Sequence, residues 1–195
     1  MRENALRGVF VESAKRDLLL DAPQARPVLR TAAQLGVPVF VHPQTDKPLH
    51  ERFKKHGRLG VRFARGTVNS ATLLAMLDGG VFEDAPGLEI VVTTLAMGGL
   101  LLAGGFGDGN RIRADTPAAQ RRHVYVDTMG LNPVQVRCAI ELLGADHVLM
   151  GTDWPIVVEK QVPERLKTAL DATGLDAAAQ QMVAGGTARK LLGIA

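Results

Sequence analysis

The chain has 195 residues, which is enough for one domain with a substantial hydrophobic core. Its composition, 46% hydrophobic and 22% charged, is typical of a globular protein and excludes a disordered chain. The formal net charge is only +3, and the single cysteine, Cys138, excludes an internal disulfide. No apolar run reaches membrane-spanning length and the first residues do not form a signal peptide, so we expect a cytoplasmic protein without a membrane partner.

Strands and helices are predicted to alternate along the chain. Continuous apolar runs predict strands at residues 8–12, 37–41, 89–94, 123–127 and 146–150. Helical periodicity, with proline at helix starts and glycine at helix ends, predicts helices at residues 21–35, 69–77, 133–143, 163–172 and 177–192. The remaining long segments, residues 42–67 and 104–117, are predicted to be loops. This alternation predicts one α/β domain, a parallel sheet covered by helices.

Function in parallel α/β folds collects where the strands end. His42 directly follows the strand at 37–41, where an imidazole can bind a divalent metal or equally bond a loop carbonyl. Asp153 follows the last strand and Gly151, which favours a metal ligand or proton acceptor over a turn residue. For Asp127, which ends the strand at 123–127, a turn role is the preferred interpretation over substrate binding or orientation of His42.

Several other residues are better explained by structure than by chemistry. Cys138 lies in an apolar helical run and is expected to belong to the core. Gly98 and Gly99 allow a close backbone approach or tight packing of elements. The remaining histidines are expected to be structural or solvated: His50, His56, His123 and His147.

Basic residues gather at two places, residues 54–65 and 111–122, without aromatic residues suited to stacking on bases. We therefore expect solvated loop and helix faces and no nucleic-acid partner.

Taken in order, these segments resemble the amidohydrolase-related family that includes aminocarboxymuconate-semialdehyde decarboxylase and γ-resorcylate decarboxylase. The resemblance rests on residues 35–43, 80–92, 125–128, 143–155 and 185–193, which look like the fifth to eighth strands and the last helix of that family. It implies a partial TIM-type (β/α)8 barrel, roughly strands 4 to 8 in a single domain over residues 1–195, without the N-terminal strands.

The resemblance also implies a function. The family's activity is metal-dependent hydrolysis or decarboxylation of a small carboxylated or carbonyl-bearing substrate, with zinc as the expected metal. His42 and Asp153 match metal ligands, and Asp153 also matches the residue that assists proton transfer. Arg111 and Arg113, in a loop, are candidates for binding a substrate carboxylate through the planar guanidinium.

Two departures from the family pattern support a competing hypothesis. The chain contains no His-x-His pair, and Ala96 stands where the family has a histidine before Gly98 and Gly99. A catalytic zinc usually has three protein ligands, so His42 and Asp153 alone would bind it weakly. The alternative is therefore a catalytically inactive remnant, or a truncated barrel that acts as a dimerisation or interaction module. Exposed edges of a partial barrel also predict a homo-oligomer.

Overall fold

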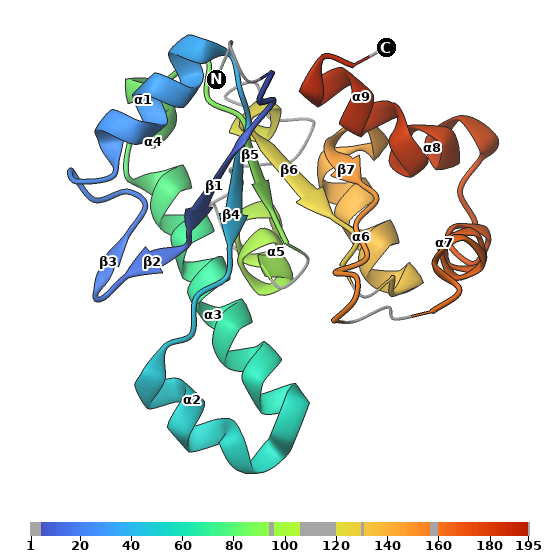
Figure 1. Cartoon of the computed structure of the whole chain (residues 1–195), viewed down its shortest axis with the longest axis horizontal. Helices are drawn as coiled ribbons and strands as arrows, with labels where there is room; N and C mark the ends of the chain where they lie inside the picture. The colour runs from blue at the N-terminus through green and yellow to red at the C-terminus, as the bar shows by residue number, and fades with distance from the viewer. Residues whose placement is uncertain (1–4, 94–95, 106–119, 130, 157–159, 195) are drawn as a thin grey trace.

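The computed structural model describes residues 5–93, 96–105, 120–129, 131–156 and 160–194. Its centre is a five-stranded sheet in which every neighbouring pair of strands is parallel (Figure 1). In spatial order the strands are β1 (Val9–Glu12), β4 (Val39–His42), β5 (Ile90–Val92), β6 (Val124–Asp127) and β7 (Val148–Leu149). The chain order thus follows the spatial order, as in one arc of a (β/α)8 barrel.

Helices connect consecutive strands of the sheet, and a short antiparallel hairpin, β2 (Ala14–Lys15) with β3 (Leu18–Leu19), follows β1. The helices are α1 (Arg26–Leu35), α2 (Lys47–Phe53), α3 (Gly57–Asp78), α4 (Val81–Asp84), α5 (Met97–Gly105), α6 (Pro133–Leu143), α7 (Val162–Asp171), α8 (Ala177–Gln181) and α9 (Thr187–Leu192). None of the helices in the described part of the chain could cross a membrane.

The two faces of the sheet are covered differently, because successive side chains of a strand point to opposite faces. Val39, Val41 and Ile90 belong to the larger core, which also contains side chains of α1, α3, α4 and α5. The opposite face carries a smaller cluster, in which Val91 and Tyr125 are joined by α9. The strand register assigns His42 and Asp127 to this second face, at the carboxyl ends of their strands.

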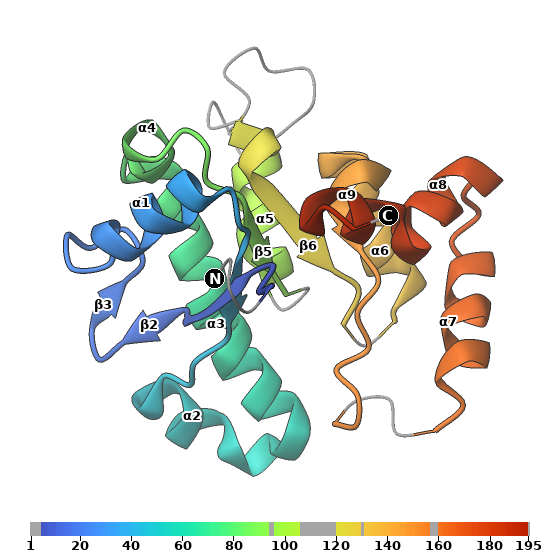
Figure 2. The same ribbon diagram turned by 45° about the horizontal axis from the view of Figure 1, so that its top comes forward.

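The predicted strands are present, with ends that differ by at most two residues, but the predicted loop at residues 42–67 is wrong. That segment forms α2, a short 3-10 turn and the first half of α3, which protrude from the sheet (Figures 1 and 2). Glycines that look like loop residues are packing positions here: a Cβ on Gly60 would lie 2.0 Å from the Phe53 carbonyl oxygen. Close approach of α2 to α3 therefore requires glycine where propensity disfavours a helix.

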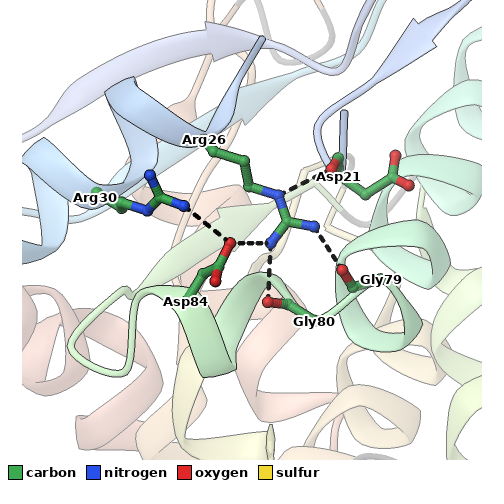
Figure 3. A network of polar contacts seen from close by, with 6 residues as sticks. All are labelled: Asp21, Arg26, Arg30, Gly79, Gly80 and Asp84. Atoms are coloured by element: carbon green, nitrogen blue, oxygen red, sulfur yellow. Dashed lines mark hydrogen bonds and ion pairs between the residues drawn. The ribbon is translucent and has the colours of Figure 1, made fainter. Parts of the chain in front are cut away.

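The helix predicted from residue 21 begins at Arg26, whose side chain fixes its start. The guanidinium donates to the carbonyl oxygens of Asp21, Gly79 and Gly80 and to the Asp84 carboxylate, which Arg30 also contacts (Figure 3). Arg26 thereby satisfies carbonyls at the end of α3 that have no partner within the helix. At the other end of the chain, the helix predicted at 177–192 is divided by a π-helical segment, Met182–Gly186, between α8 and α9.

Candidate functional site

A cavity of about 390 Å³ opens where the strands end. His42 from β4, Asp127 from β6 and Asp153 after β7 all line it. The structure therefore brings together the polar residues that the sequence singles out at the strand ends, including the two expected metal ligands.

Asp153 is held in a turn by the backbone around it. Its φ of 52° lies in the left-handed region, and its carbonyl oxygen accepts a hydrogen bond from the Ile156 amide at 2.7 Å. A non-glycine residue in this region is uncommon and costs conformational energy. The turn interpretation and the site interpretation are thus compatible, because the turn holds an exposed carboxylate at the cavity.

His42 is contacted by an arginine. The Arg65 Nη2 lies 3.2 Å from the His42 Nε2, and the same guanidinium donates to the Pro43 carbonyl oxygen from Nη2 at 3.1 Å and from Nε at 3.3 Å. A guanidinium only donates hydrogen bonds, so the His42 Nε2 accepts and carries no proton in this arrangement. The Nε2 lone pair that could bind a metal therefore faces the Arg65 guanidinium.

Asp127 has a structural role that the sequence predicts. One carboxylate oxygen accepts the Met129 amide at 3.1 Å, forming a turn at the end of β6. A Cβ on Gly151 would lie 3.1 Å from the Asp127 Cβ, so glycine permits β6 and β7 to approach closely beside the cavity.

Thr93, which follows β5, supplies a hydroxyl to the same cavity. The fully buried Asn69 of α3 donates from Nδ2 to the Thr93 Oγ1 at 3.0 Å. Because the hydroxyl oxygen accepts this bond, its own proton is available for an acceptor elsewhere. Nothing in the sequence pattern marks Asn69, since its partner is known only from the fold.

Three arginines of α3, Arg58, Arg62 and Arg65, line the same cavity as the carboxylates of Asp127 and Asp153. The lining therefore carries more positive than negative charge, which favours an anionic ligand. From the sequence, this basic cluster is expected to form a solvated loop or helix face, whereas three of its arginines line the cavity. Arg111 and Arg113, the expected carboxylate ligands, lie outside the described residues.

A second, larger cavity of about 740 Å³ adjoins the first, and the two share Arg62 and Met129 as lining residues. It lies between α3, α5 and the start of α6 and is lined largely by apolar side chains such as Leu59, Phe63 and Leu102. The candidate site thus has a basic part at the strand ends and an apolar part beside it.

The donor chemistry at the strand ends suits a divalent metal only in part. An imidazole and a carboxylate are donors that zinc and manganese accept, and both open on one cavity. Within the described residues, however, no group of three or more histidine, cysteine or acidic side chains could hold an ion. A metal on the His42 Nε2 also has to replace the Arg65 guanidinium.

The histidines expected to be structural or solvated are so, whereas Cys138, which was expected in the core, lies outside the buried core clusters. His123 and His147 are buried, and burial lowers the pKa of each imidazole. Cys138 is half-buried in α6, and burial raises the pKa of its thiol. His50 and His56, which lie in α2 and the following turn, do not line either cavity. Gly99 packs α5 against Ser70 of α3, so this glycine of the pair serves helix packing.

Comparison with known proteins agrees with the resemblance read from the sequence. The family model described as amidohydrolase matches residues 1–194. The γ-resorcylate decarboxylase of Polaromonas sp. (strain JS666) is 28% identical over 173 residues, which cover 80% of this chain and 53% of that protein. The chain thus spans about half the length of this curated relative.

Solved structures show the same fold. The 5-carboxyvanillate decarboxylase from Sphingomonas paucimobilis superposes with a TM-score of 0.77 at 23% identity, covering 97% of this chain and 59% of that one. The dihydroxybenzoic acid decarboxylase from Polaromonas sp. JS666, solved with manganese and 2-nitroresorcinol, gives a TM-score of 0.78 at 22% identity, covering 98% and 62%. The expected α/β fold of TIM-barrel type is therefore confirmed, whereas no comparison supports an inactive remnant.

Proposed function

The chain belongs to the amidohydrolase family, and from this premise we propose that it forms roughly strands 4 to 8 of a metal-dependent decarboxylase barrel for a carboxylated aromatic molecule. Decarboxylation is preferred to hydrolysis because the similar proteins named above are decarboxylases. The observation that carries the proposal is that His42 and Asp153 open on one cavity whose lining is net positive.

His42 and Asp153 are proposed as two ligands of a divalent ion, through the imidazole Nε2 and the carboxylate. Such an ion, when bound, polarises substrate oxygen atoms and withdraws electron density from the reacting group. The family resemblance implies zinc, whereas a similar structure contains manganese.

Decarboxylation breaks the bond between a ring carbon and the carboxyl group, releases carbon dioxide, and requires a proton at that carbon. Asp153 is the residue proposed to transfer it: its exposed carboxylate, which lines the cavity, takes up a proton from solvent and gives that proton to the ring carbon. The Thr93 hydroxyl, whose oxygen is engaged by Asn69, can donate to a substrate oxygen. Arg58, Arg62 and Arg65 supply the positive charge that attracts a carboxylate.

The test compares the purified chain with Asp153→Ala. We expect metal content, measured by inductively coupled plasma mass spectrometry, to fall in the variant. Release of carbon dioxide from 2,6-dihydroxybenzoate should fall by at least about a hundredfold, the usual cost of losing a positioned proton donor.

Asp171→Ala is the control, because this exposed aspartate of α7 pairs with Lys167 on the surface and lines neither cavity. It should leave metal content and turnover unchanged. Stoichiometric metal that does not depend on Asp153 would contradict the assignment.

A further inference from the structure

The arginines of α3 differ in what they contact. Arg58, Arg62 and Arg65 occupy positions i, i+4 and i+7 and therefore share one face of the helix. Arg65 is bound to Pro43 and His42, and the Arg58 Nη2 lies 3.4 Å from the Ile156 carbonyl oxygen. Arg62 makes no hydrogen bond or ion pair with any residue that the structure describes.

Arg62 lies at the boundary between the two cavities, since it lines both of them. On one side lies the basic cavity with His42 and Asp153, and on the other the larger apolar cavity with Leu59 and Phe63. A guanidinium on this boundary can donate two parallel hydrogen bonds to a carboxylate while the apolar cavity holds the attached ring. Cavities of this size and lining are typical of small-molecule sites.

We propose that Arg62 is the residue that orients the substrate: it binds the carboxylate of an aromatic acid at the boundary between the two cavities. The ring then lies in the apolar cavity, and the carboxylate faces the cavity that contains His42 and Asp153. The inference rests on the proposed function, and it names a residue that neither the sequence motifs nor the family resemblance singles out.

Electrostatics supports this choice. Three like charges on one helix face repel one another, and a bound carboxylate offsets that repulsion. Arg58 and Arg65 already have carbonyl or imidazole acceptors, so a ligand can engage Arg62 without breaking a contact within the described structure.

The experiment measures binding of 2,6-dihydroxybenzoate and of resorcinol, the same ring without the carboxylate, by ligand-observed NMR. The spectra also report any conversion of one into the other. Arg62→Met keeps the apolar stem and removes the charge, and Arg62→Lys keeps the charge without the planar fork. Arg52→Met is the matched control, because Arg52 is an exposed arginine of α2 that lines neither cavity.

We expect Arg62→Met to weaken 2,6-dihydroxybenzoate binding by roughly tenfold to a hundredfold, the range for a lost charge-assisted hydrogen bond. Resorcinol affinity should stay within about twofold, because the contacts to the ring remain. Arg62→Lys should fall between Arg62→Met and the unaltered chain, and Arg52→Met should match the unaltered chain.

Two results would overturn the inference, and they are distinguishable. If Arg62→Met binds 2,6-dihydroxybenzoate as tightly as the unaltered chain, Arg62 is not the orienting residue while the proposed function stands. If the unaltered chain binds neither compound, the proposed function fails, and the inference fails with it.

Discussion

At the scale of single residues, the contact between Arg65 and His42 places a cation at the candidate metal ligand. We expect Arg65→Gln to raise the affinity for Mn²⁺ or Zn²⁺ by about tenfold. The substitution replaces the guanidinium with a shorter, neutral amide and removes a positive charge whose repulsion amounts to about 1 kcal/mol per unit charge pair at 4 Å in water. Calorimetric titration of the metal-free chain measures the change.

Arg65→Lys is the control, since it keeps the charge and should leave metal affinity within about twofold of the unaltered chain. An equal or weaker affinity in Arg65→Gln, with unchanged circular dichroism, would mean that the guanidinium does not compete with a metal at His42.

The residues of the candidate site were predictable to different degrees. His42 and Asp153 could be singled out because a polar residue at the end of an apolar strand has a known position in a parallel fold. The α3 arginines could not, because they lie in a segment that the sequence pattern predicts to be a loop. Asn69 begins a predicted helix, but its partner Thr93 is known only from the fold. Arg58, Arg62 and Arg65 have the spacing i, i+4, i+7, which would have placed them on one helix face if residues 57–67 had been predicted to be helical.

At the scale of elements, the packing of α5 on α3 depends on one glycine of an adjacent pair. A Cβ on Gly99 would lie 2.9 Å from the Ser70 carbonyl oxygen and 3.0 Å from its Cα, whereas a Cβ on Gly98 meets only the Ser70 Oγ at 3.6 Å. Gly99→Ala should therefore destabilise the chain by about 1–3 kcal/mol through overpacking against backbone.

Gly98→Ala is the matched control, and it should be neutral or stabilising by up to about 1 kcal/mol, because alanine favours the helix. Urea unfolding of both variants, followed by circular dichroism, measures the difference. Equal stabilities would show that α5 shifts at no cost and that Gly99 is not a packing requirement.

The strands were predicted correctly, whereas the protruding helices α2 and the first half of α3 were not, and their burial explains the difference. Strands β5 and β6 are buried on both faces, and β4 is buried on one face with Phe40 half-buried on the other; all three contain continuous apolar runs, which a sequence reveals directly. The segment of α2 and the first half of α3 is largely exposed and contains Gly60, which close packing requires. Its local pattern therefore resembles a loop, although Asp46 caps α2, and contacts between the two helices support the helical structure.

At the scale of the whole molecule, five parallel strands form an arc rather than a closed barrel. No strand pairs with the outer edge of β1 or of β7 within the described part of the chain, and Phe10 of β1 is 77% exposed while stacking on Phe40. These features agree with the homo-oligomer expected from the sequence, which stays a prediction. The family resemblance identified the arc because its motifs occur in order along the chain.

At the amino ends of the strands, two histidines with equivalent contacts join neighbouring strands. The His123 Nδ1 lies 2.7 Å from the Leu88 carbonyl oxygen, and the His147 Nδ1 lies 2.8 Å from the Val124 carbonyl oxygen. Each imidazole thus links the start of its own strand to the strand before it, and each stacks on an aromatic ring, Phe82 or Tyr125, at 4.5 Å. Because a carbonyl accepts at Nδ1, both rings have a donor there and are stable in the neutral form.

These histidines predict how the stability of the whole chain depends on pH. Burial lowers the pKa of His123, with Arg122 adding to the effect and Glu83 and Glu89 opposing it, and burial likewise lowers the pKa of His147. In the unfolded chain both titrate near about 6.5, so the unfolded state binds more protons below that pH. The stabilisation is therefore complete above about pH 6.5 and is lost as the pH falls toward the folded-state values.

Urea unfolding between pH 5 and 8 measures this loss, whose slope is limited to about 1.4 kcal/mol per pH unit for each histidine. His123→Asn with His147→Asn is the informative variant, since an amide nitrogen can donate to the same carbonyl without titrating near neutral pH. The variant is less stable throughout, because the stacked rings are lost, but its stability should change less with pH. A pH dependence as steep as that of the unaltered chain would assign the acid sensitivity to other groups and remove the two histidines as its cause.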